Sequence, residues 1–106
     1  MKNQITAVAG RWRIVFTFRG DRYGYVVERA AHEMTLPSDP LWTPWLESIE
    51  GGDDEWPESP PLQQVHIEPR PRDAVVALAV GMAGLGHWSL SCLIDPIDDC
   101  ILFDVA

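Results

Sequence analysis

The sequence predicts a single all-β domain, residues 1–106, folded as an antiparallel β-sandwich or flattened barrel. Residues 11–18 alternate strictly between large apolar and other side chains, as a half-buried strand does. Residues 62–106 contain short apolar runs separated by turn signals. Eight of the nine prolines lie between Pro37 and Pro71, where they disfavour helix. We therefore expect an N-terminal hairpin, a Pro/Trp-rich connection and a C-terminal four-stranded meander.

The N-terminal hairpin is predicted by a turn that agrees with the alternation on both sides of it. Gly20 and Asp21 suit a two-residue turn with glycine at a positive φ. Pairing Arg19 with Arg22 then sets the register of the two strands. The pairs expected from it are Phe18 with Tyr23, Phe16 with Tyr25 and Ile14 with Val27 on one face, and Arg13 with Glu28 on the other.

The connection over residues 31–61 is rich in proline, which lacks the N–H donor that helices and central strands need. Residues 45–50 fit one short strand or one helical turn. Residues 50–55 combine two glycines with four acidic side chains, which is typical of a solvated loop.

The meander is expected to contain strands at residues 62–68 and 74–82, separated by a turn at residues 70–73. Residues 74–82 are apolar on both faces, which favours a central strand. A three-residue loop at 84–86 and a four-residue loop at 95–98 complete it. The expected pairs are Met82 with Trp88, Val80 with Leu90, Leu78 with Cys92 and Val76 with Ile94, followed by Leu90 with Phe103, Cys92 with Ile101 and Ile94 with Asp99.

The two cysteines fall on opposite faces in this register. Cys92 faces the core and Cys100 faces away from it, so we expect two free thiols and a reducing compartment. Residues 1–9 are too short and too polar for a secretory signal, and there is no apolar run of membrane-spanning length. These observations predict a soluble, cytoplasmic protein.

One face of the predicted meander combines small side chains with polar ones. Ala77, Ala79 and Gly81 form a shallow floor that another backbone or a flat ligand can approach closely. Packing against a second layer of the chain is the alternative, and small-residue strand faces more often serve packing. The candidate ligand- or partner-binding residues on this face are Gln64, His66, His87, Ser89, Ser91 and Asp104.

Three residues of this face raise the possibility of a hydrolase, because Ser89 is expected opposite Asp104 and His87 lies two residues away. A nucleophile elbow and a glycine-rich oxyanion loop are both absent from the sequence. The histidines and cysteines show no metal-ligand spacing. We therefore expect no catalytic residues, no metal and no cofactor, and the hydrolase is the third of the three functions considered.

Three of the five tryptophans lie in the Pro/Trp-rich connection: Trp42, Trp45 and Trp56. Exposed rings of this kind stack on sugars, which suggests a carbohydrate or small-molecule binder as the second function. The other interpretation is that these rings cover the open end of the core, because large aromatic residues supply much of a small domain's buried area.

Charge excludes one class of partner and leaves another open. The formal net charge of −8 repels phosphate backbones, so we expect no nucleic-acid partner. Because the sequence has no apolar run of membrane-spanning length, we expect no membrane partner either. Residues 31–69 carry nine acidic side chains and no lysine or arginine, whereas residues 1–30 are basic. The acidic segment can pair with the basic hairpin of its own chain or of a second copy, so a homodimer is compatible. The first expectation for function is a small non-enzymatic binding or protein-interaction module.

Overall fold

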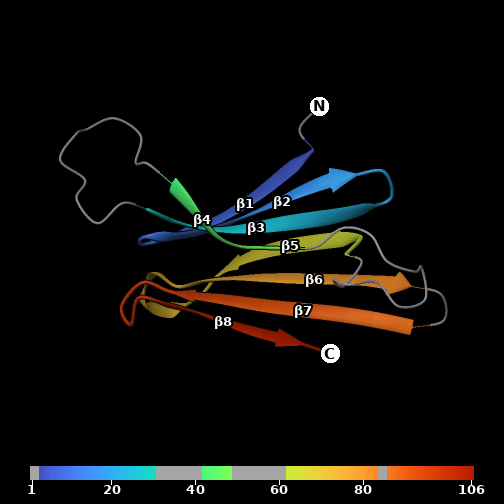
Figure 1. The fold of residues 1–106 in the computed structure, drawn as a ribbon. Coiled ribbons are helices and arrows are strands. Elements are labelled where there is room, and N and C mark those ends of the chain that lie inside the picture. The colour runs from blue at the N-terminus through green and yellow to red at the C-terminus, as the bar shows by residue number, and fades with distance from the viewer. Residues whose placement is uncertain (1–2, 31–41, 49–61, 84–85) are drawn as a thin grey trace.

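The computed structural model describes residues 3–30, 42–48, 62–83 and 86–106 as two four-stranded antiparallel sheets packed face to face (Figure 1). In each sheet the strands are neighbours in sequence order. The all-β sandwich is thereby confirmed, and the sheets are not closed into the flattened barrel. The strands of the first sheet are β1 (Gln4–Ala9), β2 (Trp12–Arg19), β3 (Arg22–Ala30) and β4 (Trp42–Glu47), and those of the second are β5 (Gln64–Pro69), β6 (Val75–Ala83), β7 (Gly86–Asp95) and β8 (Cys100–Val105).

The hairpin of β2 and β3 has the predicted register. Arg19 pairs with Arg22 at the turn, and Arg13 pairs with Glu28 on the outer face. Arg13 Nε donates a hydrogen bond to Glu28 Oε1 at 2.7 Å. Gly20 has a φ of +68°, as the turn requires. Turn chemistry and side-chain alternation specify the same pairing here.

The strands on either side of this hairpin were less well predicted. The sequence prediction omitted β1, whose alternation rests on small residues: Ala7 and Ala9 are buried, while Gln4 and Thr6 are exposed. The strand expected from residue 45 begins three residues earlier, and the helical alternative is wrong. Pro44 is tolerated because β4 is an edge strand and its pairing with β3 contains a bulge. The solvated loop predicted at residues 50–55 lies outside the described residues.

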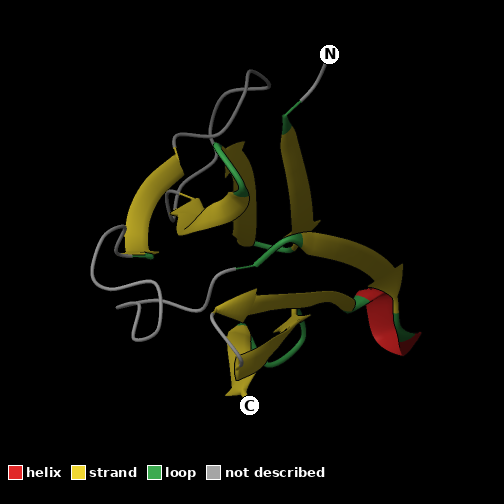
Figure 2. Cartoon of the chain, turned by 90° about the vertical axis from the view of Figure 1, so that its right-hand side faces the viewer, coloured by secondary structure: helices red, strands yellow, loops and turns green. Residues whose placement is uncertain are grey.

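The second sheet begins with a link to the first. Leu62 is fully buried, and its carbonyl accepts a hydrogen bond of 2.6 Å from the N–H of Tyr23 in β3. The turn predicted at residues 70–73 contains one 3₁₀ turn, η1 (Pro71–Asp73), which is red at the edge of the molecule in Figure 2. The strands predicted at residues 62–68 and 74–82 correspond to β5 (Gln64–Pro69) and β6 (Val75–Ala83), within two residues at each end.

The pairing of β6 with β7 differs from the prediction by one residue. Ala83 pairs with Gly86, so the expected three-residue loop is wrong; residues 84–85 themselves lie outside the described residues. Ala79 consequently pairs with Leu90, which was expected opposite Val80. Because successive side chains of a strand point to opposite faces, this shift turns the small residues of β6 inward and its large aliphatic residues outward.

Close packing of alanines accounts for this choice of face. Ala7 and Ala9 of β1 belong to the same buried cluster as Ala77 and Ala79 of β6, and each of the four is 6% exposed or less. Cα atoms of β1 approach those of β6 within 8 Å, closer than the ~10 Å at which stacked sheets usually pack. The alternative that the small-residue face packs against the chain's own second layer is therefore correct.

The pairing of β7 with β8 is shifted by two residues, which leaves the faces unchanged. Asp95 pairs with Cys100, whereas Ile94 was expected to close the loop with Asp99. Cys92 consequently pairs with Phe103 and remains fully buried in the core. The core centres on the inward side chains of both sheets, the largest fully buried ones being Phe16, Ile14, Leu62, Leu90 and Ile94.

Two glycines with positive φ provide a matched test of the turns. An ideal Cβ on Gly10 would lie 2.9 Å from Pro96 Cβ in the β7–β8 turn, whereas one on Gly20 would meet nothing within 4 Å. We expect Gly20→Ala to lower the free energy of unfolding by about 1 kcal/mol through backbone strain alone. Gly10→Ala should cost more, because Pro96 must also move. Chemical denaturation measures both; equal losses would show that the two turns are not in tight contact.

Candidate functional site: the outer face of the second sheet

The outer face of the second sheet is dominated by exposed aliphatic side chains. On β6, Leu78 lies between His66 and Ser91 of the neighbouring strands, and Val80 lies between Gln64 and Ser89. Exposed apolar area of this kind, bordered by polar residues, often marks an interaction surface. We call this surface the aliphatic face; its members are Leu78 (37% exposed), Val80 (49%), Met82 (46%) and Leu102 (58%).

The structure brings the six predicted residues of the second sheet to this face but changes their neighbours. By strand pairing, Gln64, His66, His87, Ser89, Ser91 and Asp104 all share the outer side of the sheet. The expected floor of Ala77, Ala79 and Gly81 is wrong, because these residues lie on the inner side. The exposed side chains of β6 are thus aliphatic, whereas the predicted residues of the strands on either side of it, β5 and β7, are polar.

A hollow of about 480 Å³ lies at one end of the aliphatic face. Val80 and Met82 line it together with three of the predicted residues, Gln64, His87 and Ser89. A hollow with mixed apolar and polar walls can receive one protruding side chain of a partner. The remaining lining residues are Gln63, Gly81, Trp88 and Ala106.

The serine, histidine and aspartate of this face do not form a catalytic set. Asp104 pairs with Ser91, so the predicted pairing with Ser89 is wrong. Ser89 instead exchanges two backbone hydrogen bonds of 3.0 Å with Ala106. Among the described residues, no hydrogen bond joins the side chains of His87, Ser89 and Asp104. The relay that a serine hydrolase requires is not assembled there.

Charged groups at the β5 border neutralise one another. Arg70 Nη1 donates to Glu68 Oε2 at 2.7 Å, and His66 Nε2 lies 3.0 Å from Glu68 Oε1. The hydrogen bond from Arg70, followed by that from His66, lowers the pKa of Glu68 below its usual value. The border therefore supplies hydrogen-bonding groups without a strong net charge, which suits the rim of a protein interface.

The predicted tryptophans do not form one platform. The Arg13 guanidinium lies 4.4 Å from the Trp42 ring centroid, and Arg13 is on the outer face of the first sheet. Trp45 contacts Trp12 of the core edge-on, with ring centroids 5.9 Å apart. Trp56 lies outside the described residues. Trp45 is nevertheless 68% exposed, so it only partly covers the core.

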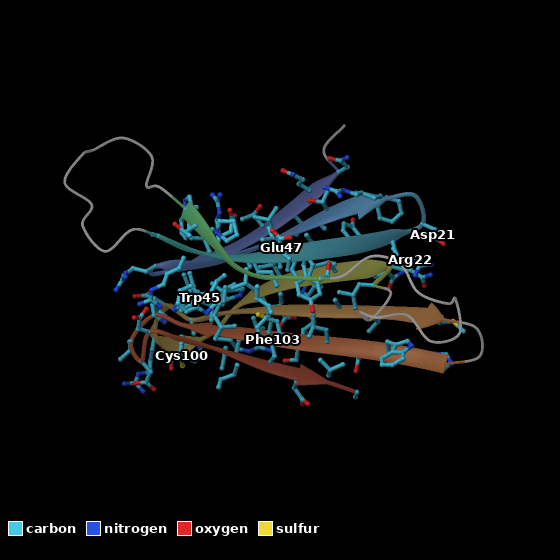
Figure 3. The ribbon with its side chains drawn as sticks, in the orientation of Figure 1. Asp21, Arg22, Trp45, Glu47, Cys100 and Phe103 are labelled. Atoms are coloured by element: carbon cyan, nitrogen blue, oxygen red, sulfur yellow. The ribbon has the colours of Figure 1, made fainter. Side chains whose placement is uncertain are left out.

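A second concave surface opens between the edge strands β4 and β8. This groove of about 460 Å³ was not predicted from the sequence. Trp45, Phe103 and Cys100 are among its lining residues and are labelled in Figure 3. Trp12 and Val27 also line it. The other lining residues are Leu46, Asp99 and Ile101.

Asp99, at the end of this groove, links the two sheets. It accepts a hydrogen bond of 2.5 Å from Arg29 Nη2 of β3 and lies 3.8 Å from Arg11 Nη1. The Arg29 guanidinium also lies 4.4 Å from the Trp12 ring centroid. The hydrogen bond from Arg29 is the largest cause that lowers the pKa of Asp99 below its usual 3.8. This cluster closes one end of the sandwich.

The lowered pKa of Asp99 predicts a small, pH-dependent stabilisation. The folded protein binds this proton less readily than the unfolded chain, so the contribution is complete above about pH 5 and is lost as the pH falls through the unfolded and then the folded pKa. Asp99→Asn should cost less than about 1 kcal/mol at neutral pH, because the Asp99 side chain is 41% exposed. Asparagine also tolerates the φ of +51° at this position.

Denaturant titrations of the parent and Asp99→Asn at pH 7 and about pH 3 test this prediction. The difference between the two proteins should shrink at the lower pH. A difference that stays constant would show that the ionised carboxylate does not stabilise the fold.

Both cysteines are free thiols, as the predicted faces require. Cys92 is buried in the core, and this burial raises the pKa of its thiol to about 12. The pKa of Cys100 is also raised, first by burial and then by Asp95 and its acidic neighbours. A raised pKa leaves little of the reactive thiolate form at neutral pH.

The described part of the chain contains no cluster of three or more residues able to hold a metal ion, and no helix in it is long and apolar enough to cross a membrane. Comparison of the sequence with protein-family models and with curated proteins, and of the fold with solved structures, finds no match. The candidate site therefore rests on the geometry of the molecule.

Proposed function

We propose that this protein is a non-enzymatic protein-interaction module that binds a partner through the aliphatic face. The observation that supports the proposal is the outward orientation of Leu78, Val80 and Met82 on β6, with Leu102 on β8. These large aliphatic side chains keep between 37% and 58% of their surface in contact with water. Covering them with a partner removes this apolar area from water and is favourable at about 25 cal/mol per Å².

The shape and charge of the face define the kind of partner. The sheet offers a broad surface with one hollow of about 480 Å³, which fits a protein surface carrying one protruding apolar side chain. The net charge of −8 favours a partner whose rim is neutral or basic, since opposite charge speeds association. Nucleic acid and anionic membranes remain disfavoured for the same reason. Two free thiols support a reducing compartment such as the cytoplasm.

Two valines of equal exposure provide the experiment. Val80 in the aliphatic face and Val8 on the first sheet are each 49% exposed. The parent, Val80→Lys and Val8→Lys are immobilised and used to capture proteins from an extract of the source cells. We expect a captured protein that is retained by the parent and by Val8→Lys but lost from Val80→Lys.

The purified partner should then bind Val80→Lys at least about a hundredfold more weakly than the parent, because a lysine amine loses water when its side chain is covered. Equal capture by all three proteins, or equal loss from the two variants, contradicts the proposal. Unfolding midpoints of both variants close to that of the parent exclude loss of the fold as the cause.

The groove between β4 and β8 supports a second candidate function, a binder of small apolar or sugar-like molecules. Its volume of about 460 Å³ is in the range of small-ligand sites, and the exposed Trp45 ring offers a stacking surface. Titration with a panel of monosaccharides and aromatic compounds, followed by tryptophan fluorescence, tests it. Binding that persists in Trp45→Ala rejects the groove as the site.

A further inference from the structure

We infer that two copies of this chain pair antiparallel along β8 and join their second sheets into one continuous eight-stranded sheet. The inference goes beyond the proposed function, because it concerns the edge of the sheet and names a second copy as the occupant. It also places the two aliphatic faces side by side on one surface. The backbone of β8, its side-chain pattern and the presence of only one charged side chain along it each support the inference.

The backbone of β8 presents a row of hydrogen-bonding groups on the side away from β7. Ser89 and Ala106 exchange two backbone hydrogen bonds of 3.0 Å, which identifies Ala106 as a hydrogen-bonded position of the antiparallel ladder. Such positions alternate along a strand. The N–H and C=O groups of Ile101, Phe103 and Val105 therefore point away from β7. In the described part of the chain no strand pairs with this side of β8.

Features that protect edge strands from pairing are present at two other edges of the sandwich and absent from β8. The β4 edge contains Pro44 and a bulge, and the β5 edge ends in Pro69 next to the charged Glu68. The β8 edge has no proline, its pairing with β7 is regular along its whole length, and its single charged side chain is Asp104.

The side-chain pattern separates β8 from the remaining edge, β1. Both strands lack proline, but β1 carries the polar Gln4 and Thr6 on its outer face. In β8, the aliphatic or aromatic positions occupy both faces: Ile101, Leu102, Phe103 and Val105. Pairing along β8 therefore buries more apolar area than pairing along β1.

Hydrogen bonding and charge select one register for the pair. With Phe103 on the two-fold axis, Ile101 faces Val105 of the second copy. The backbone N–H and C=O groups of Ile101, Phe103 and Val105 in the two chains then make about six hydrogen bonds in all. Asp104 then faces Leu102 of the second copy. If the axis lay at Asp104, the Asp104 carboxylates of the two copies would face each other, which is unfavourable. If it lay at Leu102, Val105 would face Asp99 of the second copy instead of Ile101, and Asp99 is a turn residue with a φ of +51°.

Proline at position 105 tests the interface without removing a hydrogen bond within the chain. Val105→Pro deletes an N–H that points toward the second copy, and Val105→Ala is the matched control that keeps it. Sedimentation equilibrium should show the parent and Val105→Ala approaching 23.8 kDa, twice the 11.9 kDa of one chain. Val105→Pro should dimerise at least about tenfold more weakly, because the dimer loses two hydrogen bonds. Val80→Lys should dimerise like the parent.

A cysteine on the proposed two-fold axis tests the register and does not depend on proline. In a Cys100→Ser background, Phe103→Cys places two thiols on facing residues with Cα atoms ~5.5 Å apart, within disulfide range. Val105→Cys is the control, because its two copies would lie four residues apart along the strands, about 13 Å. Mild oxidation should link Phe103→Cys rapidly into covalent dimers and Val105→Cys much more slowly.

Three results overturn the inference. The first is a parent protein that stays at 11.9 kDa at every concentration. The second is equal dimerisation of Val105→Pro and Val105→Ala, which would place the interface at another surface such as β1. The third is equal cross-linking of the two cysteine variants. If Val80→Lys dissociated the dimer and Val105→Pro did not, the two copies would pair through the aliphatic face instead of β8. If Val80→Lys only failed to capture a partner, the proposed function would be supported and the β8 pairing would be unaffected.

Discussion

Leu90→Ala is expected to lower the free energy of unfolding by about 2–5 kcal/mol, because it leaves a cavity in the centre of the sandwich. Leu90 is 2% exposed and lies on the inner face of β7. Leu102, in the aliphatic face, is 58% exposed and provides the matched control. Leu102→Ala should change the free energy of unfolding by no more than about 0.5 kcal/mol. Urea denaturation of both variants checks this contrast, and similar losses would contradict the assignment of faces in the second sheet.

Ala79→Phe is expected to destabilise the fold by about 1–3 kcal/mol, because the close approach of β1 to β6 leaves no room for a ring. Ala79 is 2% exposed, whereas the adjacent Leu78 is 37% exposed on the other side of the strand. Leu78→Phe should therefore be nearly neutral. Thermal unfolding of the two variants measures the difference. A stable Ala79→Phe together with a destabilised Leu78→Phe would restore the register expected from the sequence.

Alternation was sufficient where one face of a strand is distinctly polar. In β2 and β3 it agreed with the turn at Gly20 and gave the observed pairing of Arg13 with Glu28. It failed for β6, because both sides of that strand are apolar and neither face is marked as the outer one. The prediction paired large residues with large ones. The structure buries the small ones, since Ala7 and Ala9 allow the sheets to approach.

An error of an odd number of residues in a strand pairing turns a strand's side chains to the opposite face, whereas an error of an even number does not. A one-residue error at the β6–β7 loop inverted the faces of β6, whereas the two-residue shift in the β7–β8 pairing left Cys92 in the core. Loop conformation depends on contacts such as that between Gly10 and Pro96, which join turns distant in sequence. Local sequence patterns do not contain that information.

The shared face of the polar residues of the second sheet was predicted, but the apolar residues beside them were not. Gln64, His66 and Ser91 lie on one face as expected, yet the strand between them, β6, presents aliphatic side chains on that face. The groove between β4 and β8 was missed altogether. Its walls come from Trp45, Asp99 and Phe103, which only the stacking of the two sheets brings together.

The orientation of β6 is the central claim, and thiol accessibility measures it most directly. In a Cys100→Ser background, Val80→Cys and Ala79→Cys are treated with a maleimide, and the labelling rates are compared with that of an unfolded control. The native Cys92 is buried and should contribute little to either rate. We predict rapid labelling of Val80→Cys and protection of Ala79→Cys by at least about a hundredfold, since a buried thiol reacts only when the strand opens. Rapid labelling at position 79 with protection at position 80 would contradict the fold and the proposed interaction surface together.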